Sequence, residues 1–220
     1  MPQTLAIFDL DNTLLGGDSD HAWGEFLIAQ KLVDENQHRA SNDGFYADYL
    51  EGNLDINAYL RFVLQFIAGK TPAELVSLQE QFMSENIKQM MLEKSASLLQ
   101  KHRSAGDYLL IITATNDFIT APIAKALGVD ALLASTAEII DGRYTGQPYG
   151  TPCYHEGKVI RLKHWLANKQ FDLSTAFFYS DSHNDIPLLN AVGKPCAVDP
   201  DDRLREYATT RQWPIISLRN

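Results

Sequence analysis

A short apolar run that ends in two aspartates constrains the fold of this chain more than any other feature. Residues 5–8 are apolar and partly β-branched, and Asp9 and Asp11 follow at once. Such a run predicts a strand buried in a parallel sheet, and ligands bind beyond the carboxyl ends of these strands. Residues two apart share one face of an extended chain, so both carboxylates can approach one ligand. An isolated D-x-D more often ends in an Asx-type turn, so the rest of the chain must decide.

The rest of the chain alternates between helical and strand-like patterns. Residues 16–94 carry apolar residues at helical spacing and no convincing strand, and Thr71-Pro72-Ala73-Glu74 predicts a helix start with a capping box. Asp141-Gly142 lies between two β-prone runs and predicts a hairpin over 138–146. Further buried strands are predicted at 108–112, 131–134, 175–179, 195–198 and 214–218.

This alternation predicts an α/β fold with a doubly wound, mostly parallel sheet and an inserted all-helical domain. The expected boundaries are 1–15 and 95–220 for the α/β core, and 16–94 for the helical insertion. A chain of 220 residues is long enough for one sizeable core with such an insertion.

Composition excludes several classes of function. Lys and Arg total 19 against 28 Asp and Glu, for a net charge of −9, and no basic cluster occurs, which argues against nucleic acid as a partner. No apolar run reaches the roughly 18 residues of a membrane span. We also find no signal-peptide pattern, and two distant cysteines suggest neither a disulfide framework nor a zinc site. A cytoplasmic protein is therefore the expectation.

Polar residues gather where several predicted strands end. Asp9, Asp11 and Thr13 follow the first strand, Thr113 follows the second, and Asp181 and Asp185 follow a later one. Lys158 opens a predicted helix just before that later strand. Because the carboxyl ends of parallel strands lie at one sheet edge, these carboxylates should meet there. Nearby carboxylates repel one another and need a cation, and hard oxygen ligands suit Mg²⁺.

In order and in context, these residues resemble the four motifs of the haloacid dehalogenase (HAD) superfamily. The motifs are D-L-D-N-T at 9–13, Thr113, Lys158 and S-D-S-H-N-D at 180–185. The helical insertion after the first motif resembles the C1 cap of the phosphoserine-phosphatase-like branch, subfamily IB. The resemblance covers nearly the whole chain and implies a HAD-like, Rossmannoid core with a helical cap.

The resemblance also implies a mechanism and a role for each matching residue. Asp9 is expected to be the nucleophile that forms an aspartyl-phosphate, and Asp11 the general acid and then the general base. Thr113 and Lys158 would stabilise the transferring phosphoryl group. Mg²⁺ would be held by Asp9, Asp11 (through its backbone carbonyl), Asp181 and Asp185, with Asn184 orienting these groups. The expected substrate-binding residues are Thr13, Asn116, Asp18, Asp20 and Arg61. Asp18 and Asp20 equally suit the cap of the first helix of the insertion.

The resemblance leaves the substrate open. Phosphoserine phosphatases hold the amino-acid head group with a cap glutamate, whose position is Asp18 here, and with two arginines. Residues 60–64 retain Arg61 but place Val63 where the second arginine stands. An apolar side chain cannot replace a guanidinium that binds a carboxylate. A cationic or neutral head group, as in histidinol phosphate, therefore fits slightly better than phosphoserine.

The expected function is thus a Mg²⁺-dependent phosphomonoester hydrolase acting on a small phosphorylated metabolite. A phosphotransferase on the same fold remains an alternative, because water access depends on closure of the cap. A catalytically silent Mg²⁺-binding protein and a receiver-type signalling domain are further alternatives. In a receiver domain, however, the phosphoacceptor ends a middle strand, whereas here the D-x-D comes first. The sequence does not predict an oligomeric state.

Overall fold

A seven-stranded sheet organises residues 3–219, the part of the chain that the computed structural model describes. The strand order is β4-β3-β2-β1-β5-β6-β7, so β1 lies in the middle. All neighbours pair in parallel except β3 and β4, which are antiparallel. The bounds are β1 Leu5–Phe8, β2 Tyr108–Asn116, β3 Ala131–Ile140, β4 Arg143–Tyr149, β5 Phe177–Ser180, β6 Lys194–Val198 and β7 Ile215–Ile216.

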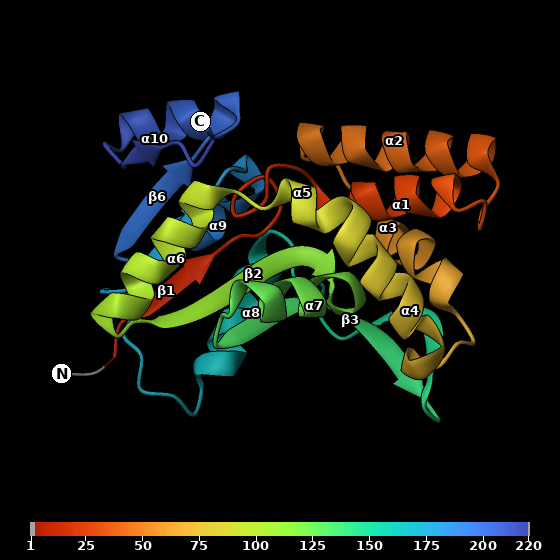
Figure 1. Cartoon of the computed structure of the whole chain (residues 1–220). Helices are drawn as coiled ribbons and strands as arrows, with labels where there is room; N and C mark the ends of the chain where they lie inside the picture. Colours follow the sequence, from red (N-terminus) through yellow and green to blue (C-terminus); the bar gives the residue numbers. More distant parts are fainter. Residues whose placement is uncertain (1–2, 220) are drawn as a thin grey trace.

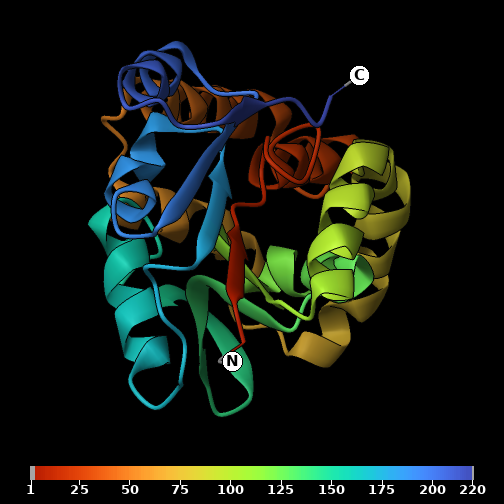
Figure 2. The same cartoon turned by 90° about the vertical axis from the view of Figure 1, so that its left-hand side faces the viewer.

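The two faces of the sheet are covered by different helices, as the doubly wound prediction required. Ala6 and Phe8 of β1 belong to the apolar core shared with α6 (Glu93–Ala105) and α7 (Asp117–Leu127). Leu5 and Ile7 point to the other core, with α8 (Glu156–Leu166), α9 (Ile186–Leu189) and α10 (Asp202–Thr210). Figure 2 shows α6 and α8 on opposite sides of β1. Successive residues of a strand face opposite ways, so a fully apolar β1 serves both cores.

Between β1 and α6 the chain is helical. It forms α1 (Ser19–Ala29), α2 (Glu35–Glu51), α3 (Ile56–Leu64), α4 (Pro72–Phe82) and α5 (Lys88–Met90). In Figure 1, α1 to α4 lie beyond the arrowheads of β1 and β2, and so above the edge of the sheet where these strands end. Trp23 packs edge-on against Phe82 of α4 and Phe118 of α7, which joins this segment to the rest of the molecule. The division at 15/16 and 94/95 stays a prediction.

Local signals in the sequence specify several element ends. Thr71 and Glu74 form the predicted capping box of α4, with Pro72 at the first helical position. Asp141 and Gly142, with φ of 50° and 76°, form the turn of the β3–β4 hairpin. Two successive positive φ values are typical of a type I′ turn, which explains the Asp-Gly pair.

Strand lengths were predicted less well. β2 continues to Asn116 rather than ending at 112, because its polar end pairs with Ser135 of β3. The short strand expected at 131–134 extends to Ile140 and leads directly into the hairpin. Conversely, Thr175 lies in a turn, with its N–H bonded to the Asp172 carbonyl, so β5 begins later than predicted. Only two residues of the expected final strand at 214–218 pair, as β7.

The predicted absence of a membrane span agrees with the helices of the structure. Among residues 3–219, none is both long and apolar enough to cross a membrane.

Candidate active site

The chain turns sharply immediately after β1 and so presents Asp9 at the end of the strand. The Asp9 N–H bonds to the carbonyl of Tyr179 at 2.9 Å, which prolongs the pairing with β5. Asn12 then adopts a left-handed conformation (φ 56°), and its N–H bonds to the Gly17 carbonyl. Asparagine tolerates this conformation better than most residues. Asp9 as a whole residue is 4% exposed and lies at the sheet edge that the sequence predicted.

Lys158 joins two of the predicted acids. Its Nζ lies 2.8 Å from Asp9 Oδ1 and 2.7 Å from the Asp185 carboxylate, although these partners are 149 and 27 residues away in sequence. The Ser180 hydroxyl also donates to Asp185, at 2.7 Å. Gly157 permits this placement, because a Cβ there would lie 2.0 Å from the Pro152 carbonyl oxygen. The start of α8 can therefore approach residue 152 closely.

Burial and charge determine the protonation of this group. Burial raises the pKa of Asp9 to about 7, with Lys158 opposing the rise and Asp185 adding to it. Burial alone would lower the pKa of Lys158, but the carboxylates of Asp185 and Asp9 hold it above its usual value. The lysine therefore remains an ammonium that is fixed against the expected nucleophile.

Asp11 has partners of its own, different from those of Asp9. Its carboxylate accepts hydrogen bonds from the Ser19 N–H at 2.7 Å and from the Thr115 hydroxyl at 2.8 Å. Thr113 lies farther away, with its hydroxyl 3.5 Å from the same carboxylate. Burial raises the pKa of Asp11 to about 6, and the Asp18 carboxylate adds to the rise. The sequence analysis missed Thr115, although a second threonine two positions along a strand shares the face of Thr113.

Thr13, which the sequence analysis expects to bind substrate, connects two acids in the structure. Its hydroxyl donates to Asp181 Oδ1 at 2.9 Å and accepts from the Asp181 N–H at 3.0 Å. The side chain is fully buried, and Asp9 Oδ2 lies 3.4 Å from the hydroxyl. Burial and the nearby Asp9 carboxylate raise the pKa of Asp181 well above its usual value. Thr13 therefore orients Asp181 beside Asp9.

The donor set around Asp9 fits a hard divalent cation. Asp9 and Asp181 lie together with raised pKa values, and the backbone carbonyl of Asp11, two positions after Asp9, is a further hard oxygen donor. The Asp11 side chain is engaged elsewhere, and Asp185 is occupied by Lys158 and Ser180, which leaves Asp185 better placed to hold the lysine than a metal. Within residues 3–219, the compact group of potential ligand side chains is His21, Glu25 and Asp43, partly exposed on α1 and α2. The proposed metal site at Asp9 differs from this group in its ligands, because it would combine two carboxylates with a backbone carbonyl oxygen.

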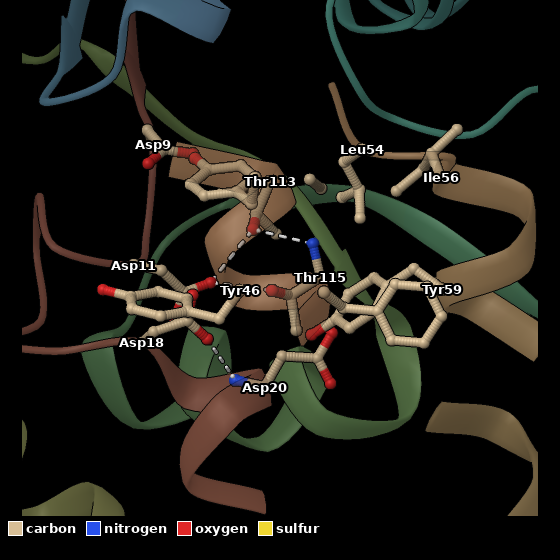
Figure 3. A pocket seen from close by; sticks show the side chains of 13 residues that line it. Asp9, Asp11, Asp18, Asp20, Tyr46, Leu54, Ile56, Tyr59, Thr113 and Thr115 are labelled. Carbon is tan, nitrogen blue, oxygen red and sulfur yellow. Dashed lines mark hydrogen bonds between the residues drawn. The ribbon is translucent and has the colours of Figure 1, made fainter. Parts of the chain in front are cut away.

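A cavity opens above these groups and is bounded by the helical segment. Figure 3 shows Asp9 at one end and Asp20 at the other, with Asp11 and Asp18 between them. Aromatic and apolar residues of α2, α3 and the loop joining them complete the walls. The lining residues are Asp9, Asp11, Asp18, Asp20, Phe45, Tyr46, Tyr49, Leu54, Ile56, Tyr59, Thr113, Ala114 and Thr115.

Three expected substrate residues lie outside this cavity: Thr13, described above, Arg61 and Asn116. Arg61 is exposed and borders a separate surface hollow with Phe62 and Gln147. The Asn116 side chain accepts from the Ile119 N–H and thereby caps α7. The sequence does not show whether the helix face that carries Arg61 meets the cavity or the solvent. The helical spacing of an arginine is the same in both cases.

The loop after β5 touches the helical segment directly. Asn184 Nδ2 donates to the Tyr49 carbonyl at 3.1 Å, and Arg203 donates to the Glu51 carbonyl at 2.9 Å. Both carbonyls lie at the C-terminal end of α2, which Gly52 closes in a left-handed conformation. His183 bonds to Asp201 at 2.8 Å and is not among the residues that line the cavity.

Buried acids at the carboxyl edge of a parallel sheet, with one lysine fixed among them beneath a helical cap, define a hydrolase of the HAD type. Comparison with known proteins agrees: the model of the haloacid dehalogenase-like hydrolase family matches residues 6–190. The chain belongs to this family, and its enzyme class is that of a phosphatase.

Individual relatives extend this assignment over the full length. A histidinol-phosphatase of Neisseria meningitidis is 43% identical over 99% of this chain and all of its own. The phosphoserine phosphatase SerB1 of Mycobacterium tuberculosis is 35% identical over 97% of this chain and 70% of its own. The crystal structure of a Bordetella pertussis protein with unknown function is 42% identical, with a TM-score of 0.91 over 99% of this chain and all of its own. A phosphoserine phosphatase structure (17% identical, TM-score 0.72, covering 100% of this chain and 95% of its own) shares the fold.

Proposed function

We propose that this chain is a Mg²⁺-dependent phosphomonoester hydrolase that works through a phosphorylated Asp9. The observation that carries the proposal is the placement of Asp9, which is bonded to Lys158 at 2.8 Å and lines the cavity together with Asp11. A buried carboxylate beside a fixed ammonium, with a second carboxyl facing the same space, suits nucleophilic catalysis on a phosphoryl group.

In the first step, an oxygen of Asp9 bonds to phosphorus while the bond from phosphorus to the ester oxygen breaks. Asp11 donates its proton to the leaving alkoxide. In the second step, Asp11 removes a proton from a water molecule whose oxygen attacks the phosphorus. The bond between phosphorus and Asp9 then breaks, which releases inorganic phosphate and restores the carboxylate. Lys158 and the Thr113 hydroxyl stabilise the charge on the transferring oxygens.

A bound Mg²⁺ would be held by Asp9, Asp181 and the Asp11 backbone carbonyl, and it would neutralise charge on the phosphoryl oxygens. Thr13 keeps Asp181 oriented for this role through its two hydrogen bonds. Asp185 positions Lys158. In a protein of net charge −9, these local cations make the approach of an anionic ester favourable.

Histidinol phosphate is the substrate that we favour over phosphoserine. The Neisseria relative named histidinol-phosphatase matches this chain over its entire length. Val63, in the place of a carboxylate-binding arginine, is 6% exposed and packs in the apolar core, so no cationic group replaces that arginine there.

Hydrolysis of p-nitrophenyl phosphate with Mg²⁺ tests the reaction. We expect Asp9→Asn to lower kcat by roughly a thousandfold or more, because the nucleophile is lost. The exposed Asp48→Asn, which removes the same charge, is the matched control and should retain full activity. Mass spectrometry of the quenched wild type should find a phosphoryl group on the peptide that contains Asp9.

Metal dependence is tested with the same assay. Chelation with EDTA should abolish turnover, and Mg²⁺ should restore it and raise the melting temperature, because binding to the native state stabilises that state. Substantial activity of Asp9→Asn, or of the chelated enzyme, would overturn the proposal.

A further inference from the structure

Asp20 is a buried carboxylate whose polar neighbour is the Tyr59 hydroxyl. It lies in the first turn of α1 and is 2% exposed, yet neither of its oxygens has a hydrogen-bond partner among residues 3–219. Burying an ionised carboxylate without a partner lowers the stability of the folded state by about several kcal/mol. A side chain left in this state indicates that something else supplies its partner.

Capping of α1 does not explain Asp20. The N-cap role belongs to Asp18, whose carboxylate accepts from the N–H groups of Asp20 at 2.9 Å and His21 at 2.8 Å. The preceding N–H, that of Ser19, bonds to Asp11. Asp11 and Asp18 thus accept the hydrogen bonds from the free N–H groups at this helix end. The Asp20 carboxylate accepts none of these bonds.

The Asp20 carboxylate points into the cavity instead. In Figure 3 it lies at the end remote from Asp9 and faces Tyr59 of α3. Tyr46 and Phe45 of α2 add further aromatic surface to the lining. Aromatic faces and carboxylates together form an environment that attracts organic cations.

The charge of the lining selects against a second anionic group on the substrate. Four carboxylates line the cavity, and the lining contains no Lys, Arg or His. Lys158 lies beneath Asp9, where the phosphoryl group would be held, and Arg61 is elsewhere on the surface. A substrate carboxylate placed near Asp18 and Asp20 would find like charges and no partner, whereas an ammonium or imidazolium group would find several.

We propose that Asp20, opposite Asp9 and facing Tyr59, forms a subsite for the cationic head group of a phosphorylated amine that carries no carboxylate. This inference rests on the proposed phosphatase function and names the feature of the substrate that the site selects. Asp20 acts in specificity and takes no part in the chemical steps.

Phosphoethanolamine and phosphoserine provide a direct test, because they differ only in the carboxylate. We expect the wild type to hydrolyse phosphoethanolamine and histidinol phosphate with a kcat/KM at least tenfold above that for phosphoserine. In Asp20→Asn, the ratio of kcat/KM for histidinol phosphate to that for neutral-headed p-nitrophenyl phosphate should fall at least tenfold, mainly through KM. Asp48→Asn should leave this ratio unchanged.

Binding without turnover separates specificity from folding. In the Asp9→Asn background, calorimetry should show that adding Asp20→Asn weakens histidinol phosphate at least tenfold, while the melting temperature does not fall. An equal loss on all substrates, or a preference for phosphoserine, would overturn the subsite while leaving the phosphatase proposal intact. If the wild type hydrolyses none of these esters, p-nitrophenyl phosphate included, the proposed function itself fails.

Discussion

At the scale of single residues, the site depends on how a few buried charges share their partners. Lys158 bonds to Asp9 and Asp185 at 2.8 and 2.7 Å, and Asp185 also accepts from Ser180. A lone buried ammonium would be unfavourable, so the second carboxylate makes it possible to keep a cation beneath the nucleophile. Asp185 thus positions Lys158, and Asp9 binds the lysine less strongly than it would as the sole partner.

Asp185→Asn should therefore weaken both stability and activity. Loss of one partner of a buried charge group typically costs about 3–5 kcal/mol, so we expect urea denaturation to show a fall of this size. We expect kcat for p-nitrophenyl phosphate to fall at least tenfold, because Lys158 loses its anchor. Lys158→Arg should not retain activity, since a planar guanidinium cannot occupy the place of a compact ammonium. Wild-type stability and kcat in Asp185→Asn would contradict this role.

At the scale of elements, local hydrogen bonds fix the helix ends, and the sequence predicts several of these bonds. In α4, the Glu74 carboxylate accepts from the Thr71 N–H at 2.7 Å, and the Glu74 N–H bonds to the Thr71 hydroxyl at 3.3 Å. The bonds from the Thr71 backbone and hydroxyl lower the pKa of Glu74 below its usual 4.5. The ionised form of Glu74 is therefore the one that stabilises the folded state.

The contribution of Glu74 should depend on pH in a defined direction. Its pKa is lower in the folded than in the unfolded state, so its stabilisation is fully present above the unfolded value and is lost as pH falls through the folded one. Glu74→Gln should lower the melting temperature at pH 7, and the difference from the wild type should shrink on acidification below the unfolded pKa. Glu80→Gln, on the exposed surface of the same helix, should show no such dependence. A difference that stays constant with pH would refute the capping role of the charge.

At the scale of the whole molecule, the cavity is too small for its proposed substrate. The space that the centre of a water-sized sphere can reach inside it is about 30 Å³, which suits one or two water molecules. Entry of a phosphate ester therefore requires the helical segment to move away from the sheet edge. The contacts from Asn184 and Arg203 to the end of α2 are among those that such a movement would break.

Arg203→Ala should loosen this contact. Its guanidinium bonds to the Glu51 carbonyl beside Gly52, so its removal should favour the open form. We expect faster amide hydrogen exchange over residues 45–52 and a kcat/KM reduced several-fold, with a nearly unchanged melting temperature. Arg211→Ala, at the C-terminal end of the helix α10 that also carries Arg203, serves as the control. Identical exchange in both variants would show that Arg203 does not hold the segment closed.

Much of the fold was predictable because the relevant forces act between near neighbours. The apolar run at 5–8, the capping box at Thr71 and the Asp-Gly pair at 141–142 each determine a local conformation through burial, hydrogen bonding or backbone sterics. Strand ends were less certain: β2 extends to Asn116 because it pairs there with Ser135 of β3, and β3 extends to Ile140 because it pairs with β4. That pairing is not visible in either strand alone.

For the candidate site, the sequence by itself determined which chemical groups are available and at which strand ends they emerge, since a two-residue period places Asp9 and Asp11 together. Tertiary structure decided how those groups are shared: Thr13 holds Asp181, Asp185 holds Lys158, and Thr115 rather than Thr113 lies closest to Asp11. It also placed Arg61 on the exposed surface and Asp20 in the lining of the cavity. The physical reason is that helical periodicity specifies a buried face, whereas only the packing of one element against another specifies what that face meets.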